Sequence, residues 1–298
     1  MDILYKLPFP QEVCSKIFTF ACKSPHNGLG GAILKNKLQV MDLDIPDNDD
    51  DIIIFDSYNI INYPRYVPIK LYLFSCFRNL TDISLFNTTV NGNISYLSLL
   101  HNLKKIWLTN TGVYGDIMTL KSLHNLKVIN LQNTGVYGDI IHLKYLLNLT
   151  EIRLFNTCVN GNIIHLKNLI NLNVINFRNT GINGNIAYLK YLYNLTELRL
   201  YNTRIIGNIT NLNSLYKLSE IGLGNTGVNG NIDDLKYLGN LIVIRLFNTN
   251  VTGDIANLKH LPNLFTLCTF NTRVYGNEYE LHEYRKKAGL KQCYCIYE

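Results

Sequence analysis

The chain has 298 residues, enough for two ordinary domains, and 28 Lys and Arg against 22 Asp and Glu give it a formal net charge of +6. Charged residues and prolines interrupt its apolar runs, so neither a membrane-spanning segment nor an export signal is predicted. The seven cysteines are odd in number and mostly scattered, which favours reduced thiols in a cytoplasmic protein over a disulfide framework.

Residues 1–55 do not repeat and are predicted to form a helical N-terminal cap. Within them, three apolar residues share one helical face at steps of four and three: Val13, Ile17 and Phe20. The stretch resembles the first half of an F-box at Phe9, Pro10, Glu12, Val13, Ile17, Phe18 and Phe20. This resemblance implies that these residues contact the adaptor subunit of a cullin-type ubiquitin ligase. The second half of the F-box pattern is not matched, so a plain cap remains the alternative.

Two short segments lead from this cap into the body of the chain. Residues 42–51 hold six aspartates and no base, without the spacing of a calcium loop, and are predicted to be a solvated loop. Residues 56–79 are predicted to be a degenerate first repeat, because Leu71, Phe74 and Phe77 match the apolar columns of the units that follow.

Residues 80–277 repeat one pattern, LxxIxLxNTxVxGxIxxLxxLxN, with a period of 23 residues, and the last of the nine units is incomplete. The units align on asparagines at Asn87, Asn110, Asn133, Asn156, Asn179, Asn202, Asn225, Asn248 and Asn271. A fixed period of this length with this leucine spacing resembles the leucine-rich repeat family, and the Gly-x-Ile step resembles its plant-type subclass. The resemblance implies an α/β fold: a curved right-handed solenoid with parallel strands on its concave face.

The chemistry of one unit supports the same architecture. Residues at the positions of Ile152 and Leu154 alternate as on a short strand with one buried face. We expect the Asn column to be buried at the following bend and to form an internal hydrogen-bonded ladder. Gly161 permits a tight turn with positive φ, and Ile163 and Leu166 suit a helical or 3₁₀ turn on the outer side. Because one unit cannot bury its own core, stacking of the units must do so.

Three outward columns of the strand vary from unit to unit and are predicted to face the concave side. An arginine two residues before an aromatic recurs every 46 residues, in Arg153 and Phe155, Arg199 and Tyr201, and Arg245 and Phe247. Arg and aromatic side chains anchor protein interfaces most often, so we predict a protein-binding patch of these six residues with Arg178 and Trp107. Two alternatives remain: an inherited duplication of a two-unit block, and neutralisation of the arginines by Glu151 and Glu197.

Other partners and chemistries are less favoured. The lysines are spread over the outer turns, which indicates a solubilising rim and makes a nucleic-acid partner unlikely. No Ser-His-Asp, paired-carboxylate or metal-ligand arrangement can be assembled, so no catalysis, cofactor or metal is predicted. Residues 278–298 are predicted to close the solenoid with a charged helix over 278–287, a Gly289 cap and an edge strand. The prediction is a non-enzymatic protein-binding module, with a ubiquitin-ligase substrate receptor as its sharper form and a scaffold or viral assembly protein as the alternative.

Overall fold

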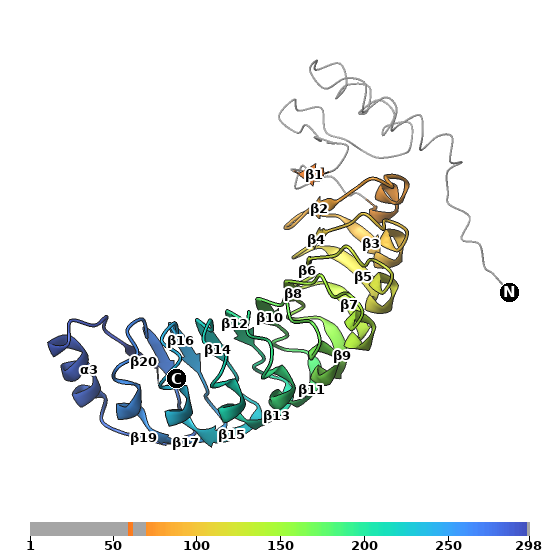
Figure 1. Cartoon of the computed structure of the whole chain (residues 1–298). Helices are drawn as coiled ribbons and strands as arrows, with labels where there is room; N and C mark the ends of the chain where they lie inside the picture. The colour runs from red at the N-terminus through yellow and green to blue at the C-terminus, as the bar shows by residue number, and fades with distance from the viewer. Residues whose placement is uncertain (1–58, 62–69, 297–298) are drawn as a thin grey trace, which may run out of the picture.

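The computed structural model describes residues 59–61 and 70–296, whose coils stack along a single arc (Figure 1). The whole predicted N-terminal cap, including the F-box-like stretch and the aspartate-rich run at 42–51, lies outside the described residues. The expectations about those segments, and the domain boundaries, therefore stay predictions.

A parallel sheet of 11 strands lines the inner side of the arc, as the repeat predicted (Figure 1). From β1 to β18, consecutive strands pair residues 23 apart, for example Val174 with Glu197, so equivalent residues of neighbouring units lie side by side. Its strands, in spatial order, are β1 (Asn59–Ile61), β2 (Asp82–Ser84), β4 (Lys105–Trp107), β6 (Val128–Asn130), β8 (Glu151–Arg153), β10 (Val174–Asn176), β12 (Glu197–Arg199), β14 (Glu220–Gly222), β16 (Val243–Arg245), β18 (Thr266–Cys268) and β20 (Tyr294–Ile296).

A second parallel sheet of nine strands lies toward the outer side of the arc and was not predicted (Figure 1). Its strands are β3 (Asn91–Asn93), β5 (Gly112–Asp116), β7 (Gly135–Asp139), β9 (Cys158–Asn162), β11 (Gly181–Asn185), β13 (Arg204–Asn208), β15 (Gly227–Asn231), β17 (Asn250–Asp254) and β19 (Arg273–Tyr275). The repeat glycine lies in these strands with positive φ, 113° at Gly161, a conformation that glycine adopts at little cost. A Cβ there would overlap the Oδ1 of Asp139 on the preceding coil.

Short 3₁₀ helices follow this second sheet: η1 (Leu71–Cys76), η2 (Ile94–Leu97), η3 (Ile117–Leu120), η4 (Ile140–Leu143), η5 (Ile163–Leu166), η6 (Ile186–Leu189), η7 (Ile209–Leu212), η8 (Ile232–Leu235) and η9 (Ile255–Leu258). An Asn or Asp caps each of η2 to η9, and its side chain accepts a hydrogen bond from a backbone N–H of the first turn. Leu71, Phe74 and Phe77 are buried in and beside η1, at the apolar positions expected of the predicted half-unit, whose extent stays a prediction.

The repeated apolar residues form one continuous core inside the solenoid. Ile152, Leu154, Val159, Ile163 and Leu166, for example, are fully buried, as are their counterparts in the complete units. A single coil offers its apolar face only to the coils on either side. The stability of the chain therefore comes from stacking, as the sequence predicted.

The Asn column does form a ladder, but the prediction that it is buried was wrong. Each Asn has φ between 51° and 57°, a left-handed conformation that Asn tolerates better than most residues, and its side chain lies at the surface. Its amide donates to the Oδ1 of the Asn one coil earlier, in eight successive bonds of 2.5–2.8 Å. The neighbouring Thr takes the inner position, and Thr157, for example, donates to the carbonyl of Leu154.

The C-terminal end closes as predicted, with α3 (Glu278–Lys287) followed by Gly289 at φ 67° and then β20. Arg285 of α3 is fully buried, which the sequence analysis missed. Its guanidinium donates to the carbonyls of Leu261, Leu264 and Lys291 at 2.7–2.9 Å, so it satisfies the exposed backbone of the last coil. Burial lowers the pKa of Arg285 from its ordinary value.

Candidate functional site

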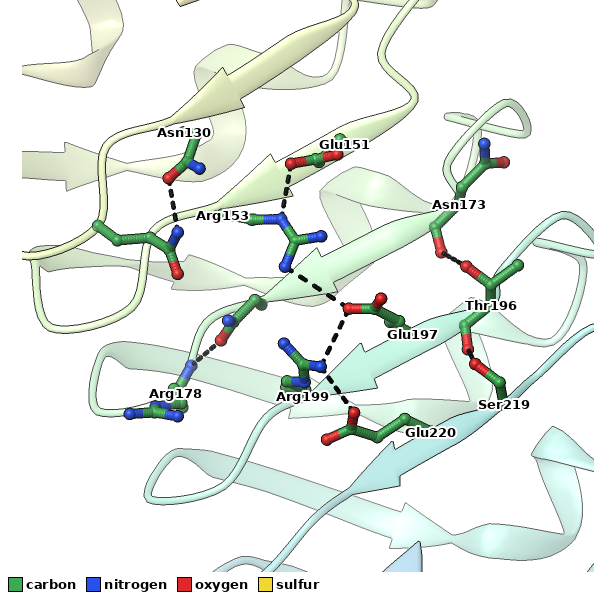
Figure 2. Close-up of polar contacts among 12 residues, drawn as sticks. Asn130, Glu151, Arg153, Asn173, Arg178, Thr196, Glu197, Arg199, Ser219 and Glu220 are labelled. Atoms are coloured by element: carbon green, nitrogen blue, oxygen red, sulfur yellow. Dashed lines mark hydrogen bonds and ion pairs between the residues drawn. The ribbon is translucent and has the colours of Figure 1, made fainter. Parts of the chain in front are cut away.

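Arg153 and Arg199 of the concave sheet lie in one row with Glu151, Glu197 and Glu220, which pair with them (Figure 2). The Nε of Arg153 lies 2.6 Å from Glu151 Oε1, and its Nη1 lies 3.5 Å from Glu197 Oε2. Arg199 bridges Glu197 and Glu220, at 3.2 and 2.6 Å. The row ends in a second bond to Glu220, from Arg245 Nη1 at 2.7 Å. Glu151 and Glu197 thus pair with Arg153 and Arg199, the arrangement that the sequence analysis left open as an alternative, and Glu220 joins them as a further acid.

Glu220 is the central acid of this row. Burial raises its pKa, but the hydrogen bond from Arg199 and the charges of Arg199 and Arg245 outweigh burial, so the pKa of Glu220 lies below its ordinary value. The hydrogen bond with Glu220 also raises the pKa of Arg199. Glu220 was not among the residues predicted for the site. The signal for its role was present in the sequence, because β14 puts this glutamate between the strands that carry Arg199 and Arg245.

A second row runs beside the ion pairs and is made of rings and one unpaired arginine. The guanidinium of Arg178 lies over Phe155, 4.2 Å from the ring centroid, and over Tyr201 at 5.1 Å. Its Nη1 also donates to the Tyr201 hydroxyl at 2.5 Å. The row continues through Phe247, 6.3 Å from Tyr201, and ends in Phe270, whose ring stacks on Phe247 at 5.0 Å. We call these five residues the aromatic row.

Two glycines explain how the aromatic row crosses a coil that contributes no ring. Gly222 and Gly224 are the outward residues of β14 and its extension, where other coils carry side chains. A Cβ on Gly224 would overlap the Phe247 ring, and one on Gly222 would lie 3.2 Å from Tyr201. The missing side chains therefore allow these rings to lie over the coil and approach each other. Phe270 and both glycines were absent from the predicted site.

Trp107, the remaining predicted residue, lies outside the aromatic row. Its ring packs against Phe86 at 5.7 Å, and the Lys105 ammonium lies 4.4 Å from the ring centroid. The next coil carries Asn130, which is buried and accepts hydrogen bonds from Thr109 and Gln132. The eight predicted residues thus fall into two clusters on the concave sheet. Trp107 lies in the cluster nearer the N-terminal end, and the other seven belong to the ion-paired row and the aromatic row.

The concave face combines an unneutralised arginine with half-buried rings. Arg178 has no carboxylate partner among residues 70–296, and its Nε is buried without a hydrogen bond. Within the same residues, no group of three or more His, Cys, Asp or Glu is arranged to hold a metal ion. Half-buried rings and a guanidinium held flat against them suit contact with another chain, because such groups lose little conformational entropy on binding.

Comparison with known proteins gives matches in structure alone. No family model and no curated protein sequence matches the chain. The leucine-rich repeat ectodomain of the receptor kinase GASSHO1/SCHENGEN3 from Arabidopsis thaliana superposes with a TM-score of 0.65 at 24% identity, covering 76% of this chain and 28% of the ectodomain. The plant peptide hormone receptor RGFR1 gives 0.66 at 22% identity, with 73% and 36% covered. A plant ice-binding protein gives 0.59 at 17% identity, with 85% and 87% covered.

The chain has the leucine-rich repeat fold. This solenoid spans only 28% and 36% of the two receptor chains, and the identities to these three proteins are 24%, 22% and 17%, so the likeness concerns the fold. The receptor comparison contradicts the cytoplasmic location that we predicted, since ectodomains of membrane receptors lie outside the cell. No helix in the described part of the solenoid is long and apolar enough to cross a membrane.

Proposed function

We propose that this solenoid binds a protein or peptide on its concave face and that the aromatic row carries the contact. The observation behind the proposal is the continuous run of Phe155, Arg178, Tyr201, Phe247 and Phe270 across the sheet, with an arginine that pairs with no acid among residues 70–296. The ion-paired arginines beside it act as a rigid floor. The expectation that Arg153, Arg199 and Arg245 themselves bind is therefore replaced by a positioning role.

Two kinds of evidence support a peptide or protein as the ligand. Aromatic and arginine side chains that are partly shielded from solvent are the commonest hot spots of protein interfaces. Several structurally similar chains are complexes with peptides, among them RGFR1 with RGF2 and the HAESA ectodomain with an IDA peptide hormone.

The test is capture of partners by the purified full chain, followed by affinity measurement with the partner so found. Tyr201→Ala combined with Phe247→Ala should weaken binding at least 100-fold, as expected for two truncated hot spots. Tyr114→Ala combined with Tyr137→Ala removes two rings, 52% and 48% exposed, from the second sheet and is the matched control. Equal losses in both double variants, or no loss in the first, would refute the proposal.

A narrower function rests on the N-terminal resemblance alone. In that version the aromatic row holds a target, and the F-box-like residues dock the adaptor of a cullin-type ubiquitin ligase. Ile17→Ala combined with Phe18→Ala should then abolish adaptor capture while leaving target binding at the concave face unchanged. A folded variant that still captures the adaptor, or a full chain that never does, would remove this version and leave a binding scaffold.

A further inference from the structure

The charge of the chain is concentrated on one edge of the solenoid. The loops that lead from the 3₁₀ helices η2 to η9 to the next strand of the concave sheet contain no Asp, Glu or Arg. We call these eight loops the return edge: 98–104, 121–127, 144–150, 167–173, 190–196, 213–219, 236–242 and 259–265. They hold nine of the 28 Lys and Arg residues of the chain. The rest of the chain has 19 basic residues and 22 acidic residues, a net charge of −3.

The return edge also exposes most of the large apolar side chains that the solenoid leaves in water. Among the residues that the structure describes, ten of the 19 such side chains lie on it, with exposed fractions of 43–71%. They are Leu99, Tyr145, Leu147, Ile170, Tyr191, Tyr193, Tyr216, Tyr237, Ile242 and Phe265. Four consecutive coils place Leu147, Ile170, Tyr193 and Tyr216 at equivalent positions, so these side chains follow one another along the edge. Apolar exposure gathered in this way marks an interaction surface.

The backbone of the return edge is held in place, so these side chains are presented outward. Two leucines of each loop are buried, as Leu169 and Leu172 are in one coil. In seven of the coils an Asn side chain donates to a backbone carbonyl of the preceding coil, as Asn171 donates to Leu147 at 3.0 Å. The loops of successive coils are therefore aligned with one another along the arc.

Lysine and tyrosine pair regularly on this edge. The ammonium groups of Lys144, Lys190 and Lys236 lie 4.8–5.1 Å from the ring centroids of the tyrosines that follow them. These pairs recur in every second coil, 46 residues apart. Each combines an apolar body with a positive charge at the surface, the composition found where proteins meet the headgroup region of a bilayer.

We propose that the return edge binds the surface of an anionic lipid bilayer. Nine lysines without a single acid are complementary to a negatively charged plane, and the exposed leucine and isoleucine side chains gain by entering the acyl boundary. A bilayer is uniform along its plane, which suits an edge that carries lysine and no acid in all eight loops and exposed apolar side chains in seven of them. A nucleic acid would use the lysines and tyrosines but gain little from Leu99, Leu147, Ile170 and Ile242, and it favours arginine, which the edge lacks.

The experiment is co-sedimentation of the full chain with vesicles of phosphatidylcholine alone or with about a third phosphatidylserine. Binding is expected to the anionic vesicles only, and to weaken as salt is raised. Lys144→Gln, Lys190→Gln and Lys236→Gln together should weaken it about 100-fold, from roughly fivefold per lysine. The charge-matched control replaces Lys286, Lys287 and Lys291, exposed lysines of the C-terminal segment, with Gln and should change binding less than tenfold.

A second pair of variants tests the apolar part of the proposal. Leu147→Ser combined with Ile170→Ser should weaken binding at least tenfold with the charge unchanged, whereas Tyr114→Ser combined with Tyr137→Ser should not. All substituted side chains are exposed, and circular dichroism verifies that each variant is folded. No binding to anionic vesicles would overturn the proposal, and so would equal losses in edge and control variants. Tighter binding to a single-stranded oligonucleotide, lost in the same edge variants, would assign the edge to nucleic acid instead.

Discussion

Replacing Glu220 with glutamine tests whether the concave arginines are held by one central acid. Glu220 accepts hydrogen bonds from Arg199 and Arg245 at 2.6 and 2.7 Å, and its side chain is only 13% exposed. A hydrogen bond to a charged group contributes about 1.5–3 kcal/mol when buried. Because the two arginines are 26% and 36% exposed, solvent screening reduces this. We expect E220Q to lower the free energy of unfolding by about 2 kcal/mol at neutral pH.

The pH dependence of that difference gives a sharper check. The pKa of Glu220 is lower in the folded than in the unfolded chain, so its stabilisation is complete above the unfolded value near 4.5 and is lost as pH falls through the folded value. Urea unfolding of both proteins at several pH values should show the gap closing below about pH 4.5. Glu151→Gln removes a single arginine partner at 2.6 Å and should cost less at neutral pH. A gap that is unchanged by acid, or that widens, would refute this account of the row.

Three further changes test the frame of the solenoid. Arg285→Met should lower the free energy of unfolding by about 3–5 kcal/mol, because three backbone carbonyls lose their hydrogen-bond donor. Amide hydrogen exchange should then accelerate first in the last coils, and uniform acceleration along the chain would argue against a capping role. Gly207→Ala should lower the free energy of urea unfolding by more than about 2 kcal/mol, because Gly207 has φ 111° and a Cβ there would overlap the Asn185 side chain. The control Gly239→Ala should change it by less than about 1 kcal/mol, because the space around Gly239 is open. Asn179→Ala should lower the free energy of unfolding by about 1 kcal/mol more than Asn179→Gly, since both variants break the Asn ladder but only alanine is strained in the left-handed conformation. Equal losses in the two variants would show that the ladder alone matters.

The sequence alone predicts the stacked coils well, because residues such as Ile152 and Leu166 recur with a period that leaves one way to bury them. It placed the Asn column inside, since a recurring polar residue suggests a buried bond, whereas the Thr hydroxyl makes that bond and the Asn lies at the surface. The second sheet was missed because its strands contain Gly and Asn, residues that are poor strand formers on their own.

The candidate site was only partly accessible from the sequence, for similar reasons. The recurring arginines are visible in the sequence, but which of them is unpaired depends on the rotamers that bring Arg178 onto Phe155 and Tyr201. Arg285 resembles the other charged residues of α3 until the helix is docked on the last coil. The return edge was interpreted as a solubilising rim because its lysines were considered singly. The signal that reveals it, the absence of acids from eight aligned loops, can be read in the sequence.

The period of two coils that the two surfaces share restricts how the number of coils in this protein can change. Arg153, Arg199 and Arg245 on one face, and the Lys-Tyr pairs on another, both recur every 46 residues. Deleting the single coil between Arg153 and Arg199 would bring these arginines onto adjacent strands and would also remove Arg178. Removal or duplication of two coils together keeps both patterns in phase. Recombination between its repeated gene segments should therefore yield viable products in steps of two coils, and single-coil variants should be rare among functional lengths.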